Sequence, residues 1–84
     1  MAFVTKTVKI ESDWLLVTNK VAMLQFNDTM HMALTSGEVP TETVGFVMKA
    51  GEKYVNSSSE VSVYAKSLRG GTAIESVRVA EWEA

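Results

Sequence analysis

The sequence contains no cysteine, and this absence excludes both disulfide cross-links and the thiolate ligands of zinc clusters. It also fits a protein that matures in a reducing cytoplasm. Long apolar runs are missing too, because no stretch approaches the roughly 18 residues that a membrane-spanning helix needs. The N-terminus alternates polar and apolar residues and so lacks the form of a secretory signal. We therefore expect no membrane association, and a chain that stays, at least at first, in the compartment that made it.

An excess of positive charge is also absent. Lys and Arg number 8 and Asp and Glu number 10, which gives a formal net charge of -2 at pH 7. The charges are interspersed and form no basic stripe, so the electrostatic footprint of nucleic-acid binding is missing. No glycine-rich loop follows a predicted strand and opens a helix, as phosphate-binding motifs require. We expect neither a nucleic-acid partner nor a cofactor.

The 84 residues suit one domain, spanning 1–84, because a second core would need roughly 100 residues more. A domain of this size buries only about 60% of the surface that its unfolded chain exposes, and without disulfides its usual additional support is oligomerisation or docking. Apolar residues make up 46% of the sequence and charged residues 21%. A compact fold of this length would struggle to bury all of its apolar side chains, so some are expected to face a partner.

Strict alternation of apolar and polar residues, which is typical of half-buried β-strands, recurs along the chain. In the first case, Val4, Val8 and Ile10 share one parity. Turn sequences separate such segments at intervals of about 8 to 12 residues. The predicted strands occupy residues 4–10, 14–18, 21–26, 30–35, 44–48, 53–55, 60–68 and 72–82, with a single helical turn as the alternative for 14–18. This pattern predicts an all-β fold, a single small antiparallel β-sandwich or barrel of about 7–8 short strands.

Two details of the connections follow from turn chemistry and parity. Asn27-Asp28-Thr29 is a sequence that tolerates turn conformations, and it favours a β-hairpin between the predicted strands 21–26 and 30–35. In the last predicted strand, Ile74 has the wrong parity for the face that holds Val77. A one-residue β-bulge near position 75 or 76 would restore the alternation.

Tryptophan and tyrosine are amphipathic and are enriched at interface hot spots, although they also cover the ends of ordinary β-sandwiches. The candidate interface residues are Trp14, Tyr54, Tyr64 and Trp82. Methionine adapts to irregular packing, and a core position is favoured over an interface for the large apolar residues of the central strands. These residues are Met23, Phe26, Met30, Met32, Leu34, Phe46 and Met48.

His31 is the only histidine, and its parity is opposite to that of Met30 and Met32, which predicts that it faces solvent or a neighbouring subunit. The nearest acidic residue is Asp28, in a predicted turn. A catalytic or metal-binding histidine needs further partners, and the sequence nominates no nucleophile or second ligand. We therefore expect no enzyme activity, since an enzyme would require His31 to sit in a concave pocket among several carboxylates.

Five short motifs follow one another between about Val21 and Trp82. They are Ala22-Met23-Leu24-Gln25-Phe26-Asn27, Gly45-Phe46-Val47-Met48-Lys49-Ala50-Gly51-Glu52-Lys53-Tyr54, Val63-Tyr64-Ala65-Lys66-Ser67, the small-residue turn Arg69-Gly70-Gly71-Thr72, and Val77-Arg78-Val79-Ala80-Glu81-Trp82. In this order they resemble small β-sandwich proteins and domains encoded among bacteriophage structural genes, including head decoration and fibre components. The methionine-rich central strands depart from that pattern.

The resemblance implies a structural component of a bacteriophage particle, either a capsid decoration protein or a fibre or tail accessory protein, that acts by surface complementarity. Its partners would be other phage structural proteins. It would also be a homo-oligomer, and a trimer would suit a capsid three-fold site. Its location would be the virion, after assembly in the cytoplasm of the bacterial host. The resemblance implies no catalytic residue.

A second interpretation of the same residues is a monomeric module that binds a carbohydrate or a peptide. In that case Trp14, Tyr54, Tyr64 and Trp82 would form a stacking surface. Clustering of these four side chains on one exposed face around a groove would favour this alternative.

Overall fold

The computed structural model describes residues 2–40, 45–68 and 75–83, which form eight β-strands and no helix. The strands are β1 (Ala2–Ile10), β2 (Leu15–Thr18), β3 (Ala22–Phe26), β4 (Met30–Thr35), β5 (Phe46–Met48), β6 (Lys53–Asn56), β7 (Ser62–Ser67) and β8 (Glu75–Glu83). The all-β prediction is confirmed, and the segment for which a helical turn was the alternative forms β2. Within these described ranges, no helix is long and apolar enough to cross a membrane.

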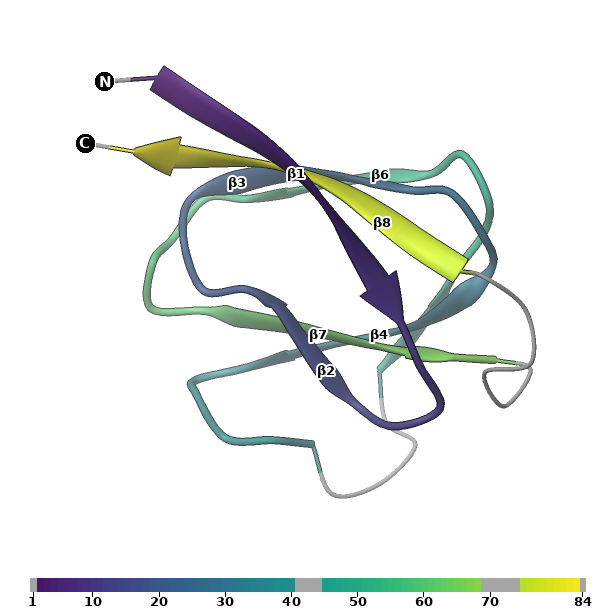
Figure 1. Cartoon of the computed structure of the whole chain (residues 1–84). Helices are drawn as coiled ribbons and strands as arrows, with labels where there is room; N and C mark the ends of the chain where they lie inside the picture. The colour runs from purple at the N-terminus through teal and green to yellow at the C-terminus, as the bar shows by residue number, and fades with distance from the viewer. Residues whose placement is uncertain (1, 41–44, 69–74, 84) are drawn as a thin grey trace.

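The strands form two antiparallel sheets of four strands each, stacked as the layers of a β-sandwich (Figure 1). Sheet A has the order β1-β8-β3-β6, and sheet B has the order β2-β7-β4-β5. Sheet A forms the upper layer in Figure 1 and sheet B the lower one. Because β1 pairs with β8 along its whole length, Ala2 and Glu83 lie opposite each other at one corner of the molecule.

The connection between β3 and β4 crosses from sheet A to sheet B, so the β-hairpin predicted there is wrong. The turn at Asn27-Asp28-Thr29 is instead attached to β8. Asn27 donates its backbone N–H to the Ser76 carbonyl over 3.1 Å, and the Ser76 N–H donates to the Asp28 carboxylate over 3.2 Å. Asn and Asp suit tight turns of many kinds, and here these bonds hold the turn while the chain passes to the facing layer. Among the described strands, only β4 and β5 are neighbours both in the chain and in a sheet.

The bulge predicted near position 75 or 76 is also wrong, because the register of β1 and β8 is unbroken. The register shifts instead in β2, at Val17. This places both Val17 and Thr18 in the interior. β8 is paired on both sides, where a bulge would disrupt two ladders, whereas β2 is an edge strand. Ile74 and the turn Arg69-Gly70-Gly71 lie outside the described residues.

The two layers enclose an apolar core made from the inward positions of both sheets. The residues of this core are Ile10, Val17, Ala22, Leu24, Phe26, Met30, Met32, Val63, Ala65, Val77 and Val79. Of the large central-strand residues predicted to be core, the structure buries three, half-buries one and exposes three. The buried ones are Phe26, Met30 and Met32, the half-buried one is Met48, and the exposed ones are Met23, Leu34 and Phe46.

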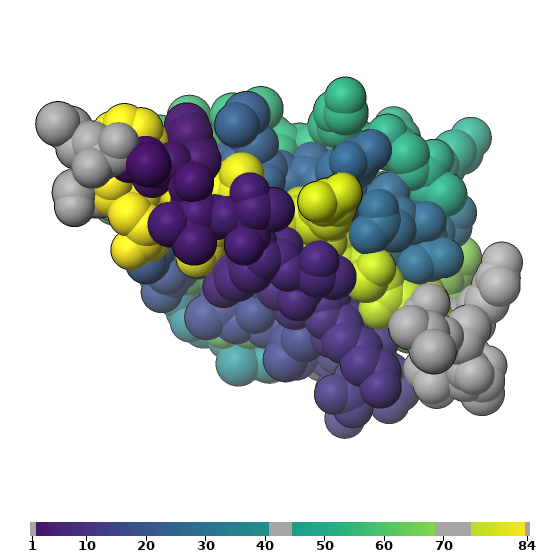
Figure 2. Space-filling model, turned by 45° about the horizontal axis from the view of Figure 1, so that its top comes forward, coloured from purple at the N-terminus to yellow at the C-terminus, as the bar shows by residue number. Residues whose placement is uncertain are grey.

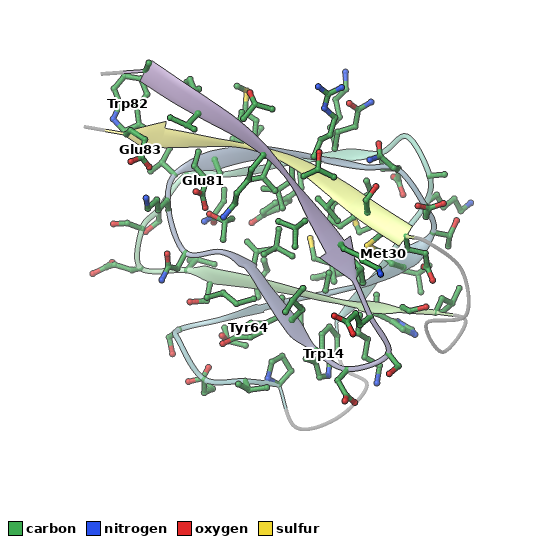
Figure 3. All side chains as sticks on the ribbon, viewed as in Figure 1. Trp14, Met30, Tyr64, Glu81, Trp82 and Glu83 are labelled. Carbon is green, nitrogen blue, oxygen red and sulfur yellow. The ribbon has the colours of Figure 1, made fainter. Side chains whose placement is uncertain are left out.

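Two carboxylates of β8 connect the layers through hydrogen bonds, and Figure 3 shows one of them, Glu81, between the two sheets. Glu81 accepts a bond of 2.5 Å from the Thr18 hydroxyl of sheet B, and the Lys6 ammonium lies 3.3 Å from the same carboxylate. At the other end of β8, Glu75 accepts a hydrogen bond from the Ser67 hydroxyl of sheet B. Burial raises the pKa of Glu81, but the Thr18 hydroxyl and the Lys6 charge outweigh that effect and hold the pKa below its ordinary value. Hydrogen bonds between the sheets therefore supplement their apolar contact.

Candidate functional site

The four aromatic residues predicted as an interface are divided between the two sheets, and Figure 3 shows Trp14 and Tyr64 beside sheet B and Trp82 on sheet A. Trp82 is exposed on β8, and Tyr54 packs against the core from β6. Trp14 is half-buried before β2, with the Lys66 ammonium 5.4 Å from its ring centre. Tyr64 is buried on β7, in the layer opposite Trp82. The four side chains do not share an exposed face, so the condition that would favour a carbohydrate- or peptide-stacking module is not met.

A loop of the same chain covers the part of the outer face of sheet B that holds Tyr64. β7 places Tyr64 on this face, because Val63 and Ala65 beside it point into the core. Tyr64 is nevertheless only 6% exposed, and its hydroxyl donates to the Gly37 carbonyl over 3.4 Å. Pro40, three residues further along the loop, is buried as well. Tyr64 therefore holds this loop against the sheet.

The outer face of sheet A has no such cover within the described residues, and it exposes a set of apolar side chains. We define the apolar strip as Phe3, Met23, Val55, Ala80 and Trp82. The register aligns Met23 with Ala80 on one side and with Val55 on the other, so these three form a row across three strands. Phe3 and Trp82 form an edge-to-face pair with ring centres 5.1 Å apart. Figure 2 looks obliquely onto this face, where β1 (purple), β8 (yellow), β3 (blue) and β6 (teal) lie side by side.

The large residues of the apolar strip are strongly exposed, with values of 43% for Phe3, 47% for Met23, 61% for Val55 and 39% for Trp82. Only Trp82 was among the predicted interface residues, and sequence reasoning missed the others. For Met23 the signal was available, because it alternates with Leu24 and so must point outward when Leu24 points inward. The abundance of methionine in the central strands led instead to a core prediction.

A shallow hollow of about 350 Å3 lies on the same outer face. Its outward side chains come from all four strands of sheet A and are Thr5, Met23, Gln25, Lys53, Val55, Arg78 and Ala80. Arg78 lies opposite Gln25, which in turn lies opposite Lys53 on the next strand. The hollow therefore has an apolar side, shared with the apolar strip, and a cationic side.

Positive charge on this face is not balanced within it. Lys9, Lys53 and Arg78 occupy outward positions of β1, β6 and β8, and no acidic residue occupies an outward strand position of sheet A in the described ranges. The ion pairs of the described residues use other lysines, Lys6 and Lys20. The outer face of sheet A is therefore cationic, on a chain whose formal net charge is negative.

His31 lies half-buried on the outer face of sheet B, between Val47 of β5 and Lys66 of β7. It points away from the methionines of the core, as its parity predicts. The nearest acidic residue in the sequence, Asp28, accepts a hydrogen bond from the backbone of Ser76. In the part of the chain that the structure describes, no three His, Cys, Asp or Glu side chains are grouped to hold a metal ion.

The outer face of sheet A is the candidate functional surface. It suits recognition by contact, because desolvated apolar groups supply affinity while charged groups favour some partners over others. Comparisons of the chain with protein-family models, with curated proteins and with solved structures found no match.

Proposed function

We propose that this chain is a non-catalytic structural domain of a bacteriophage particle, either a capsid decoration protein or a fibre or tail accessory protein, that acts by packing against other proteins. The observation that carries the proposal is the apolar strip on the outer face of sheet A. Single exposed apolar residues are common on protein surfaces, whereas a contiguous group of them marks an interaction site.

The small size of the chain supports the same proposal. With 84 residues and no cysteine, it has a limited core and no disulfide. The loop with Pro40 covers Tyr64 on the outer face of sheet B, while the apolar strip on sheet A stays exposed. Docking through the apolar strip would add the apolar burial that such a small domain lacks.

The bacteriophage assignment rests on the resemblance in the order of short motifs, which extends from β3 to β8. The partners would be other phage structural proteins, and the location would be the virion after assembly in the host cytoplasm. Self-association, with a trimer at a capsid three-fold site, belongs to the same proposal.

The test is the mass of the purified protein by light scattering across dilution, alone and mixed with the particle proteins encoded beside its gene. We expect a stable assembly, and we expect the pair of changes Met23→Ser and Val55→Ser to weaken its binding to a particle protein about tenfold or more. The matched control is Val47→Ser, which changes an equally exposed apolar residue on sheet B and should leave the assembly unchanged. A protein that stays monomeric, binds none of these proteins and is encoded in a metabolic operon would overturn the proposal.

A further inference from the structure

We propose that the partner of the outer face of sheet A is an acidic protein surface, whose carboxylates meet Arg78 and Lys53 while its apolar side chains cover the apolar strip. This inference rests on the proposed function, because it names the chemistry of the partner at the same surface. It is carried by the segregation of charge on that face and by the geometry of the hollow.

The charge argument begins with the cations that lack a carboxylate partner. Arg78, Lys53 and Lys9 are exposed on the outer face, and no ion pair engages them among the described residues. Asp28, which follows β3, and Glu52, which precedes β6, both bond to backbone N–H groups. Asp28 accepts from the Ser76 N–H over 3.2 Å, and Glu52 accepts from the Lys49 N–H over 2.7 Å. Carboxylates from another molecule would complete the pairing of the cationic face.

The register fixes where those carboxylates must lie. Arg78 and Lys53 stand in one row with Gln25 between them, two strand spacings apart, which corresponds to about 10 Å. The apolar row of Met23, Val55 and Ala80 lies two residues further along the strands, at about 7 Å. The hollow spans both rows. A matching surface presents two separated carboxylates on one side and apolar side chains beside them.

Two other occupants fit this face less well. A second copy of the same face would bring two sets of the same three cations, Lys9, Lys53 and Arg78, into one interface, and no outward strand position of sheet A in the described ranges offers a carboxylate to pair with them. Self-association would have to use another surface, such as the free edge of β1. A nucleic acid would satisfy the cations but would leave the apolar row against phosphates and sugars, and three cations provide only a small electrostatic footprint.

The experiment is a titration of the isotope-labelled protein, followed by amide NMR shifts, with a peptide that alternates glutamate and leucine. The expected result is that this peptide shifts amides of β3, β6 and β8 on the outer face, and that added salt weakens the effect. A peptide that alternates lysine and leucine, and a DNA duplex, should leave those amides unshifted. Shifts caused equally by all three probes, or by the DNA alone, would overturn the inference.

Charge-reversal variants make the test specific. Arg78→Glu combined with Lys53→Glu should weaken binding of the acidic peptide about fivefold or more and admit the basic peptide instead. Lys66→Glu places the same kind of change on the outer face of sheet B and should leave both results unchanged. The NMR spectra establish that each variant is folded. Equal binding of the acidic peptide by the wild type and the double variant would refute the inference.

The same variants separate this inference from the proposed function. If a phage particle protein binds the wild type and the double charge-reversal variant equally well, the inference fails and the proposed function stands. If the acidic peptide binds as expected but no particle protein does, the inference stands and the proposed function fails.

Discussion

On the outer face of sheet B, Tyr64 is 6% exposed, whereas on the outer face of sheet A, Val55 is 61% exposed. Both residues occupy outward positions of regular strands, so strand alternation alone does not distinguish them. The difference is the loop that contains Gly37 and Pro40, which lies over sheet B and has no counterpart over sheet A in the described residues. An outward apolar residue therefore marks an interaction surface only where the chain does not cover it.

The largest effect is expected where the loop returns to sheet B. Gly45 has a φ of +118°, and a Cβ added there would lie 2.2 Å from the Met32 carbonyl oxygen and 3.1 Å from the Ala33 Cα. The variant Gly45→Ala must displace the backbone of β4, and its residue 45 must also adopt a strained φ. We expect the free energy of unfolding, measured by urea denaturation, to fall by about 4 kcal/mol.

Gly37→Ala is the matched control for this change. Gly37 also has a positive φ, of +132°, but nothing lies within 4 Å of an added Cβ. The free energy of unfolding of this variant should fall only by the strain of an unfavourable φ, roughly 1–2 kcal/mol. Equal losses at Gly37 and Gly45 would show that the close approach to β4 is not what fixes the loop.

The next effect compares a covered outward residue of sheet B with an exposed outward residue of sheet A. Tyr64→Ala removes a buried ring and its hydrogen bond to Gly37, and should lower the free energy of unfolding by about 3 kcal/mol. Val55→Ala removes a side chain that is mostly in water, and should change the same quantity by less than about 0.5 kcal/mol. If thermal and urea denaturation gave similar losses for both variants, the two faces would not differ as described.

A smaller effect is expected from the hydrogen bond that joins the two sheets. Thr18→Val removes the hydroxyl that donates to Glu81 and keeps the shape of the side chain. At pH 7 the free energy of unfolding should fall by about 2 kcal/mol, because a buried carboxylate loses a hydrogen-bond donor. Thr7→Val, on the exposed part of β1, is the control and should have no measurable effect.

The Thr18 effect should also depend on pH. The folded state holds the pKa of Glu81 below its ordinary value, so this carboxylate contributes stability at pH values above that ordinary value. The contribution is lost as the pH falls through the lower folded-state pKa. The difference between wild type and Thr18→Val should therefore shrink between pH 5 and the acid limit of the fold, and a constant difference would argue against a charged hydrogen bond.

The strands of this fold are readable from the sequence, but their partners are not. Alternation placed β1, β3, β4 and β8 within a few residues of their observed bounds, because one buried face imposes a period of two. The same alternation does not predict which strands are neighbours in a sheet. Asn27-Asp28-Thr29 has the chemistry of a hairpin turn, yet its contacts with Ser76 of β8 accompany a crossing between sheets. Long-range contacts of this kind leave no local pattern.

The candidate site was less predictable than the fold. Residue type nominated Tyr64 and Trp82 equally, although one holds a loop and the other is exposed. The deciding information is the path of the loop near Pro40, which depends on tertiary packing. The cationic side of the hollow could not be predicted from the sequence either. Lys53 and Arg78 come from strands that are distant in the sequence, and these strands are brought near each other because both pair with β3.

The place of β8 in sheet A has a consequence for how the chain folds as it is made. β8 follows the other seven strands in the chain, yet it lies between β1 and β3. β1 is therefore synthesised well before β8, the strand with which it pairs. The side chain of Ile10 cannot reach its buried position beside Glu75 and Val77 until β8 has been made. Pairings across such long separations form slowly. Sheet A cannot be completed strand by strand during translation, and arrival of the last strand is the event that closes the domain.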